Sequence, residues 1–187
     1  MTPMADAHEL PGSLRRDATD PGDDPATAEA RGTALLAQVR EPMLAGLSAG
    51  LPRWLVDRAG GVLAVWRPGA LDDAVRAELT TAASAATERV VGEVAALLAL
   101  DPAEQRATPM TIVRTAHVEP GAVLTRLGVP HVARDPFEER ANPADVHALA
   151  PPDLAAVDPD LGPLLLAWGL GKATVLRARA ARGAGPR

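Results

Sequence analysis

The polar residues between Arg114 and Lys172 form the densest set of side chains in this sequence that could do chemistry. Arginine and histidine side chains can hold an anion, and short helices that aim their N-termini at one place would add backbone N–H donors. The same charges also suit a structural role, in which they cap and cross-link short helices, and we favour that role. The candidate anion-binding residues are Arg114, His117, Arg126, His131, Arg134, Asp135 and Lys172.

A metal site is the second chemistry that these residues suggest. His117, His131 and His147 lie in one stretch of the chain, and Asp135 or Glu139 would supply a carboxylate. Their spacings match no metal motif, such as two histidines one helical turn apart. The chain also has no cysteine, which excludes thiolate sites and disulfides. We therefore expect no metal and no cofactor.

The sequence gives weaker evidence for a catalytic nucleophile or for a phosphate-binding loop. The only serines are Ser13, Ser48 and Ser84, and none lies in a glycine-flanked elbow. The run Gly169-Leu170-Gly171-Lys172 is too short for a phosphate-binding loop and lies within an apolar stretch. No catalytic residue can be assigned, so we favour a protein that is not an enzyme.

The composition of the chain limits the classes of binding partner and the cellular compartment that we expect. The 187-residue chain has a net charge of −5, which argues against a general nucleic-acid binder, although arginines gather near its C-terminal end. Those arginines also suit the negative end of a helix dipole. No apolar run approaches the ~20 residues that span a bilayer, and the first residues lack the charged-then-apolar pattern of a secretion signal. We expect a cytoplasmic protein that contacts neither membrane nor nucleic acid.

The elements that must position these residues are helical, and the strongest pattern covers residues 71–100. Its apolar side chains recur at alternating steps of three and four residues, which is the helical period. The stripe consists of Leu71, Val75, Leu79, Ala82, Ala86, Val90, Val94 and Leu97. One long amphipathic helix of this kind needs other helices to cover its apolar face.

The N-terminal part of the chain is interrupted by prolines. Residues 1–27 are acidic, contain several Pro and Gly, and predict a disordered arm. From residue 28 an apolar helical period begins, but Pro42 and Pro52 fall inside it. We predict helices at about 28–40, 43–49 and 52–58. The run Val62–Trp66 fits a strand or a helical turn, and we favour a helix or an extended linker because no second strand is available.

Capping residues before proline recur in the C-terminal half. A residue before proline avoids the α region, so such pairs predict helix starts. They predict a cluster of short helices in residues 101–160, followed by a last helix at about 161–181. The pairs are Asp101-Pro102, Thr108-Pro109, Asp135-Pro136, Asn142-Pro143 and Asp158-Pro159, with Glu119-Pro120 and Pro151-Pro152 as weaker versions.

Five short segments stand out in the C-terminal third of the chain. They are residues 121–124, 127–130, 134–140, 143–146 and 167–172, which read GAVL, LGVP, RDPFEER, PADV and AWGLGK. Through these segments, residues 113–172 resemble a family of small actinobacterial proteins of uncharacterised function. The resemblance implies no activity, cofactor or catalytic residue.

Together these patterns predict an all-α protein, a helical bundle around one long central helix with a cluster of short proline-initiated helices in its C-terminal half. We expect an acidic arm at 1–27, a single helical domain at 28–182 and a frayed tail at 183–187. For function we favour a non-enzymatic adaptor or regulatory protein that acts through protein–protein contacts. The alternative is a binder of small anionic ligands, or an enzyme, that uses the Arg/His/Asp cluster at 114–147.

Overall fold

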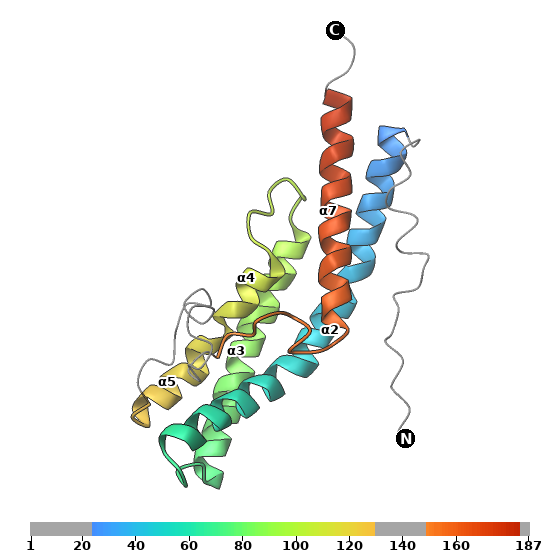
Figure 1. Ribbon diagram of the computed structural model, residues 1–187. Coiled ribbons are helices and arrows are strands. Elements are labelled where there is room, and N and C mark those ends of the chain that lie inside the picture. The colour runs from blue at the N-terminus through green and yellow to red at the C-terminus, as the bar shows by residue number, and fades with distance from the viewer. Residues whose placement is uncertain (1–23, 130–148, 184–187) are drawn as a thin grey trace, which may run out of the picture. The chain divides into compact units, whose positions relative to one another are not determined.

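The computed structural model describes residues 24–129 and 149–183. These residues form helices joined by turns, with no strand among them, so the all-α prediction is confirmed. They divide into two compact units. Unit 1 contains residues 24–39 and 166–183, and unit 2 contains residues 40–129 and 149–165. Helices α2 and α7 (Figure 1) each contribute residues to both units.

Helix α2 runs from Pro25 to Trp66 without a break, so the three predicted helices and the uncertain segment at 62–66 are one element. Of the two outcomes expected at Pro42 and Pro52, a kink or a restart of the helix, the restart is wrong. A proline removes one backbone hydrogen bond and crowds the preceding turn, which costs about 3 kcal/mol. The carbonyls that lose their partners belong to Gln38 and Ser48, which are exposed and can be hydrated. A long buried row of α2 side chains offsets the cost.

That buried row recurs every four residues. Successive members therefore advance by about 40° around the helix, because each residue turns the chain by about 100°. Within unit 2 the row thus turns about half-way round α2 and contacts different partners along its length. The segment at Val157–Leu161 closely approaches Gly46 and Gly50, whereas residues 59–63 pack with Leu79. The row consists of Leu35, Val39, Met43, Leu47, Leu51, Leu55, Ala59 and Leu63.

The start of α2 lies earlier than predicted, because Asp24 caps it. Its carboxylate accepts hydrogen bonds from the backbone N–H of Ala26 at 2.9 Å and of Thr27 at 3.2 Å. Pro25 then occupies the first helical position, where its missing N–H costs nothing. The rest of the predicted arm, residues 1–23, lies outside the described residues.

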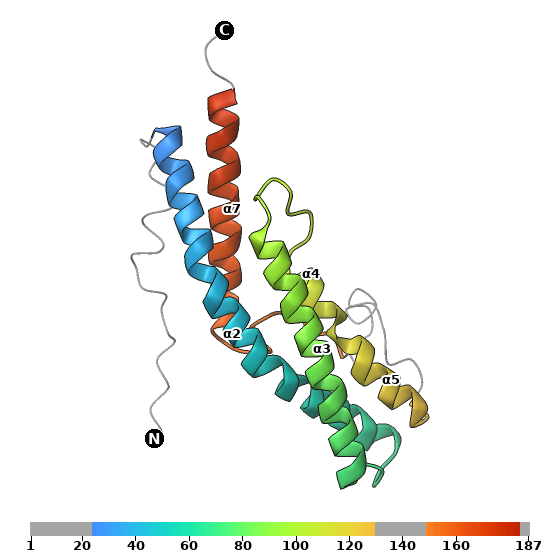
Figure 2. The same cartoon turned by 180° about the vertical axis from the view of Figure 1, so that it is seen from behind.

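Helix α3, Asp73–Ala99, matches the long helix expected at 71–100. Asp72 is its N-cap and accepts a hydrogen bond from the Val75 N–H at 2.8 Å. The predicted stripe is the buried face: Leu79, Ala86, Val90, Val94 and Leu97 are buried, while Ser84 on the other side is exposed. This face packs against α4, α5 and the C-terminal end of α2 (Figure 1, Figure 2).

The described part of the C-terminal half contains fewer separate helices than expected. Helix α4 (Pro109–Val113), the 3-10 turn η1 (Arg114–His117) and α5 (Val118–Arg126) follow one another directly. Thr108 is the N-cap of α4, as predicted, and accepts from the Thr111 N–H at 3.1 Å. The prediction at Glu119-Pro120 is wrong, because this pair lies inside α5.

Two other predicted caps stabilise turns rather than helices. Asp101 accepts from the Ala103 N–H at 2.9 Å in a turn, and Asp158 accepts from the Asp160 N–H at 2.9 Å. Helix α7 begins after that second turn, at Leu161, and ends at Gly183. The pairs Asp135-Pro136 and Asn142-Pro143 lie outside the described residues.

Candidate functional site

The predicted anion-binding residues are divided among unit 2, unit 1 and the part of the chain outside the described residues. Arg114, His117 and Arg126 lie on the α4–α5 stretch of unit 2, whereas Lys172 lies on α7 in unit 1. The remaining members, His131, Arg134 and Asp135, lie outside the described residues, as do His147 and Glu139 of the possible metal site. Among residues 24–129 and 149–183, no three His, Asp or Glu side chains are placed to hold a metal ion.

Each described member of the predicted set has a partner from its own surroundings. The Nδ1 atom of His117 lies 2.7 Å from the carbonyl oxygen of Arg114, within one helical turn. Arg114 in turn donates to the Pro152 carbonyl at 3.4 Å, which ties η1 to the 149–158 segment. Arg126 forms an ion pair with Glu78 that links α5 to α3. The contacts of Arg114 and Arg126 join neighbouring elements of unit 2, and the role of the whole set stays a prediction.

The densest polar cluster in unit 2 surrounds Arg89, which was not among the predicted site residues. Its Nε and Nη2 atoms donate to the two oxygens of Glu119 at 2.7 and 3.0 Å. Nη1 donates to Glu93 at 3.2 Å and to the Thr115 hydroxyl at 2.9 Å, while Nη2 also donates to the Thr115 carbonyl at 2.9 Å. All five guanidinium N–H groups are therefore used, which fits a clamp between α3 and the η1–α5 segment.

This cluster also shifts two pKa values. Hydrogen bonds from Arg89 lower the pKa of Glu119, against the opposing effect of partial burial. The bond to Glu119 is also the largest cause that raises the pKa of Arg89, so the guanidinium stays charged. Of the contacts that Arg89 makes, only the one with Glu93 could be predicted from the sequence, because the two residues have the i,i+4 spacing of a helical ion pair. Glu119 lies too far along the chain for such a rule.

Unit 1 consists of the N-terminal part of α2 and most of α7, which lie side by side (Figure 1, Figure 2). Their closest approach is at two glycines. A Cβ atom added to Gly32 would lie 2.9 Å from the Gly171 carbonyl oxygen and 2.9 Å from a methyl group of Val175. One added to Gly171 would lie 3.0 Å from Leu36. Only glycine allows the two backbones to approach this closely.

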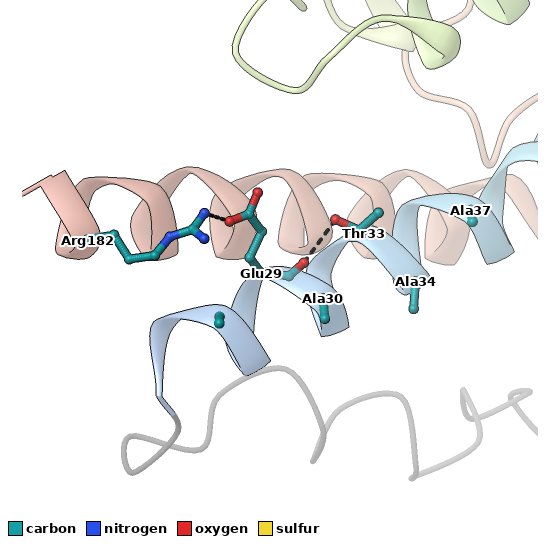
Figure 3. A pocket seen from close by; sticks show the side chains of 7 residues that line it. Glu29, Ala30, Thr33, Ala34, Ala37 and Arg182 are labelled. Atoms are coloured by element: carbon teal, nitrogen blue, oxygen red, sulfur yellow. Dashed lines mark hydrogen bonds and ion pairs between the residues drawn. The ribbon is translucent and has the colours of Figure 1, made fainter.

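An ion-pair cluster at one end of unit 1 joins the same two helices. Glu29 of α2 accepts from the Nε atom of Arg179 at 2.8 Å and also pairs with Arg182 (Figure 3). Beside it, an open groove of about 600 Å³ follows α2, and Thr33 in this groove donates its hydroxyl to the Glu29 carbonyl at 2.9 Å. The groove is lined by Ala26, Glu29, Ala30, Thr33, Ala34, Ala37 and Arg182.

Lys172 and Trp168 form a second contact within α7. The ammonium nitrogen lies 5.2 Å from the centre of the indole ring, within the range of a cation–π interaction. Trp168 itself is buried, and its indole nitrogen has no hydrogen-bond partner among the described residues. Lys172 therefore acts as a local packing partner, one helical turn from Trp168, rather than as part of a phosphate-binding loop.

The side of α7 that faces away from this seam is mostly apolar and partly exposed, with Leu170 and Ala173 half-buried. Trp168, Gly171, Val175 and Ala178 are buried, whereas the opposite face begins at Leu166, whose exposed fraction is 70%. This outer face of α7 consists of Leu166, Leu170, Ala173, Leu176, Arg177 and Ala180. Its residues recur at the spacing of one helix face, with Leu176 at the edge. Exposed apolar side chains gathered on one face are typical of contact surfaces.

Comparisons of the chain with protein-family models, curated proteins and solved structures give no match. The resemblance of residues 113–172 to an actinobacterial family stays a prediction. In the part of the chain that the structure describes, none of the helices is both long and apolar enough to cross a membrane.

Proposed function

We propose that this protein is a non-enzymatic adaptor or regulatory protein that binds another protein through the outer face of α7. The observation that carries the proposal is the exposure of large aliphatic side chains on that face: 70% of Leu166 and 36% of Leu176. Burying one such side chain contributes about 1.5–3 kcal/mol, so leaving two exposed on one helix forgoes substantial free energy.

The construction of unit 1 supports the same proposal. Two helices have only one seam between them, and here that seam is centred on glycines and small side chains. An amphipathic helix gains most of its stability from packing, and a helix pair leaves one side of each helix outside the seam. A helix of a partner protein laid on the outer face of α7 would bury its leucines.

The test compares two variants in which one exposed leucine becomes polar. Leu166→Gln removes the most exposed leucine of the outer face of α7, whereas Leu100→Gln changes a leucine that is 45% exposed in unit 2. Both should fold with melting temperatures near that of the unchanged protein. In affinity purification from the native cells, a partner should be retained by the Leu100→Gln protein and lost from the Leu166→Gln protein. Equal recovery with both variants would contradict the proposal.

A further inference from the structure

We propose that the partner segment bound by the outer face of α7 is an acidic amphipathic helix. This inference rests on the docking function proposed above and adds the chemical class of the partner. The argument has two parts, the shape of the face and the sign of its charge.

The shape of the face suits a helix. Leu166, Leu170 and Ala173 have the i, i+4, i+7 spacing, and Ala180 extends the same face for two further turns. The face from Leu166 to Ala180 is thus on the order of 20 Å long. Its middle is small, at Ala173, which allows the backbone of a second helix to approach closely. Helix-in-groove recognition uses anchors at this spacing.

The charged side chains of α7 all have one sign. Helix α7 carries four basic side chains and no acidic one over its whole length. Arg177 lies on the face itself, and its Nε donates to the Ala173 carbonyl at 3.3 Å, which keeps the guanidinium beside the alanine. Lys172 lies at the edge next to Leu176 on the helical wheel. A partner with carboxylates flanking its apolar stripe would meet these cations.

The same charges argue against a second copy of α7 as the occupant. Two α7 helices face to face would place basic side chains on both sides of an apolar seam, and like charges opposite each other weaken an interface. Arg179 and Arg182 are paired with Glu29, and Lys172 lies over the Trp168 ring, so Arg177 sets the sign on the face itself. The charge therefore selects an acidic partner over self-association.

The experiment uses two designed helical peptides and the full chain. One peptide has Leu at heptad positions a and d, Glu at e and g, and Ala elsewhere, and the other has Lys in place of Glu. Binding is measured by fluorescence anisotropy at low and high salt. The Glu peptide should bind, and the Lys peptide should bind at least about tenfold more weakly. Raising the salt from about 0.05 to 0.5 M should weaken the binding of the Glu peptide.

Single substitutions assign the binding to the face. Leu166→Gln should weaken binding of the Glu peptide by about tenfold or more, because it removes a buried aliphatic anchor. Arg177→Gln should weaken it by about two- to fivefold, the effect of a rim ion pair. Leu100→Gln and Arg76→Gln, at exposed positions in unit 2, should leave the affinity unchanged.

Several results would overturn the inference. If the Lys peptide binds as well as the Glu peptide and Leu166→Gln still abolishes binding, the face docks partners but the acidic class is wrong. If neither peptide responds to Leu166→Gln, the docking function itself fails. If sedimentation shows a dimer that Leu166→Gln converts to a monomer, the face is an interface between copies of this chain.

Discussion

Arg89 connects more elements than any described residue of the predicted anion site does. Its five N–H groups bond to Glu93 on α3, to Thr115 on η1 and to Glu119 on α5. The carboxylate and the guanidinium are each about two-thirds buried, so their hydrogen bonds exclude part of the competing water. At the residue scale, this clamp makes the packing of α3 sensitive to one carboxylate.

Glu119→Gln should therefore lower the free energy of unfolding by about 1–2 kcal/mol at neutral pH, because a neutral amide cannot replace a charged acceptor of two N–H groups. Glu88→Gln, at an exposed position on α3, should change it by less than about 0.5 kcal/mol. Urea denaturation of the three proteins measures both effects. Equal midpoints for Glu119→Gln and the unchanged protein would contradict the clamp.

The same residue predicts part of the pH dependence. The pKa of Glu119 is lower in the folded protein than its ordinary value of 4.5, so the stabilisation is complete above that value. As the pH falls below it, the unfolded carboxylate takes up a proton first, and stability is lost until the folded group is protonated as well. Thermal melts between about pH 7 and pH 3 should fall less steeply for Glu119→Gln. Parallel curves of melting temperature against pH for Glu119→Gln and the unchanged protein would contradict this prediction.

At the element scale, the two glycines of unit 1 set the distance between α2 and α7. Gly32→Ala should lower the free energy of unfolding by about 1–2 kcal/mol, since the added methyl group meets a backbone carbonyl. Gly92→Ala on α3 is the matched control, because nothing lies within 4 Å of the added atom. It should raise stability by about 0.5–1 kcal/mol through helix propensity. Stabilisation by both substitutions would show that the seam is loose.

The buried stripe of α3 provides a second pair of substitutions to compare. Ala86 is fully buried and Ser84 is exposed, two residues apart on the same helix. Ala86→Leu should cost about 1–3 kcal/mol, because the side chain overfills a packed contact, whereas Ser84→Leu should change stability by less than about 0.5 kcal/mol. The denaturation midpoints of the two variants measure these two effects. Equal tolerance of the two leucines would mean that this stripe is not the packed face.

These elements also show what the sequence could predict. The boundaries of α3 followed from a regular apolar period and nearly coincide with the prediction of 71–100. The continuity of α2 did not follow, because local proline rules were outweighed by burial against distant segments. The contacts of Glu119 with Arg89 and of Gly32 with Gly171 join residues far apart in the chain, which no local pattern encodes.

At the scale of the whole molecule, the two units should differ in local stability. In its described residues, unit 1 has a single helix–helix seam, whereas α3 in unit 2 packs against several elements. Regions with fewer packed contacts open more readily. Hydrogen exchange should therefore be faster at the amides of residues 28–39 and 170–180 than along the buried face of α3, and Gly32→Ala should accelerate it in unit 1 alone. A uniform rate across both units would contradict this difference.

The central claim, that the outer face of α7 docks another protein, can be tested directly inside cells. A photo-crosslinking amino acid is placed at position 166, and a second protein carries it at position 100 as the control for an exposed leucine. We predict that position 166 gives a discrete adduct with a different protein and that position 100 does not. Adducts at neither position, at both equally, or only between copies of this chain would contradict the claim.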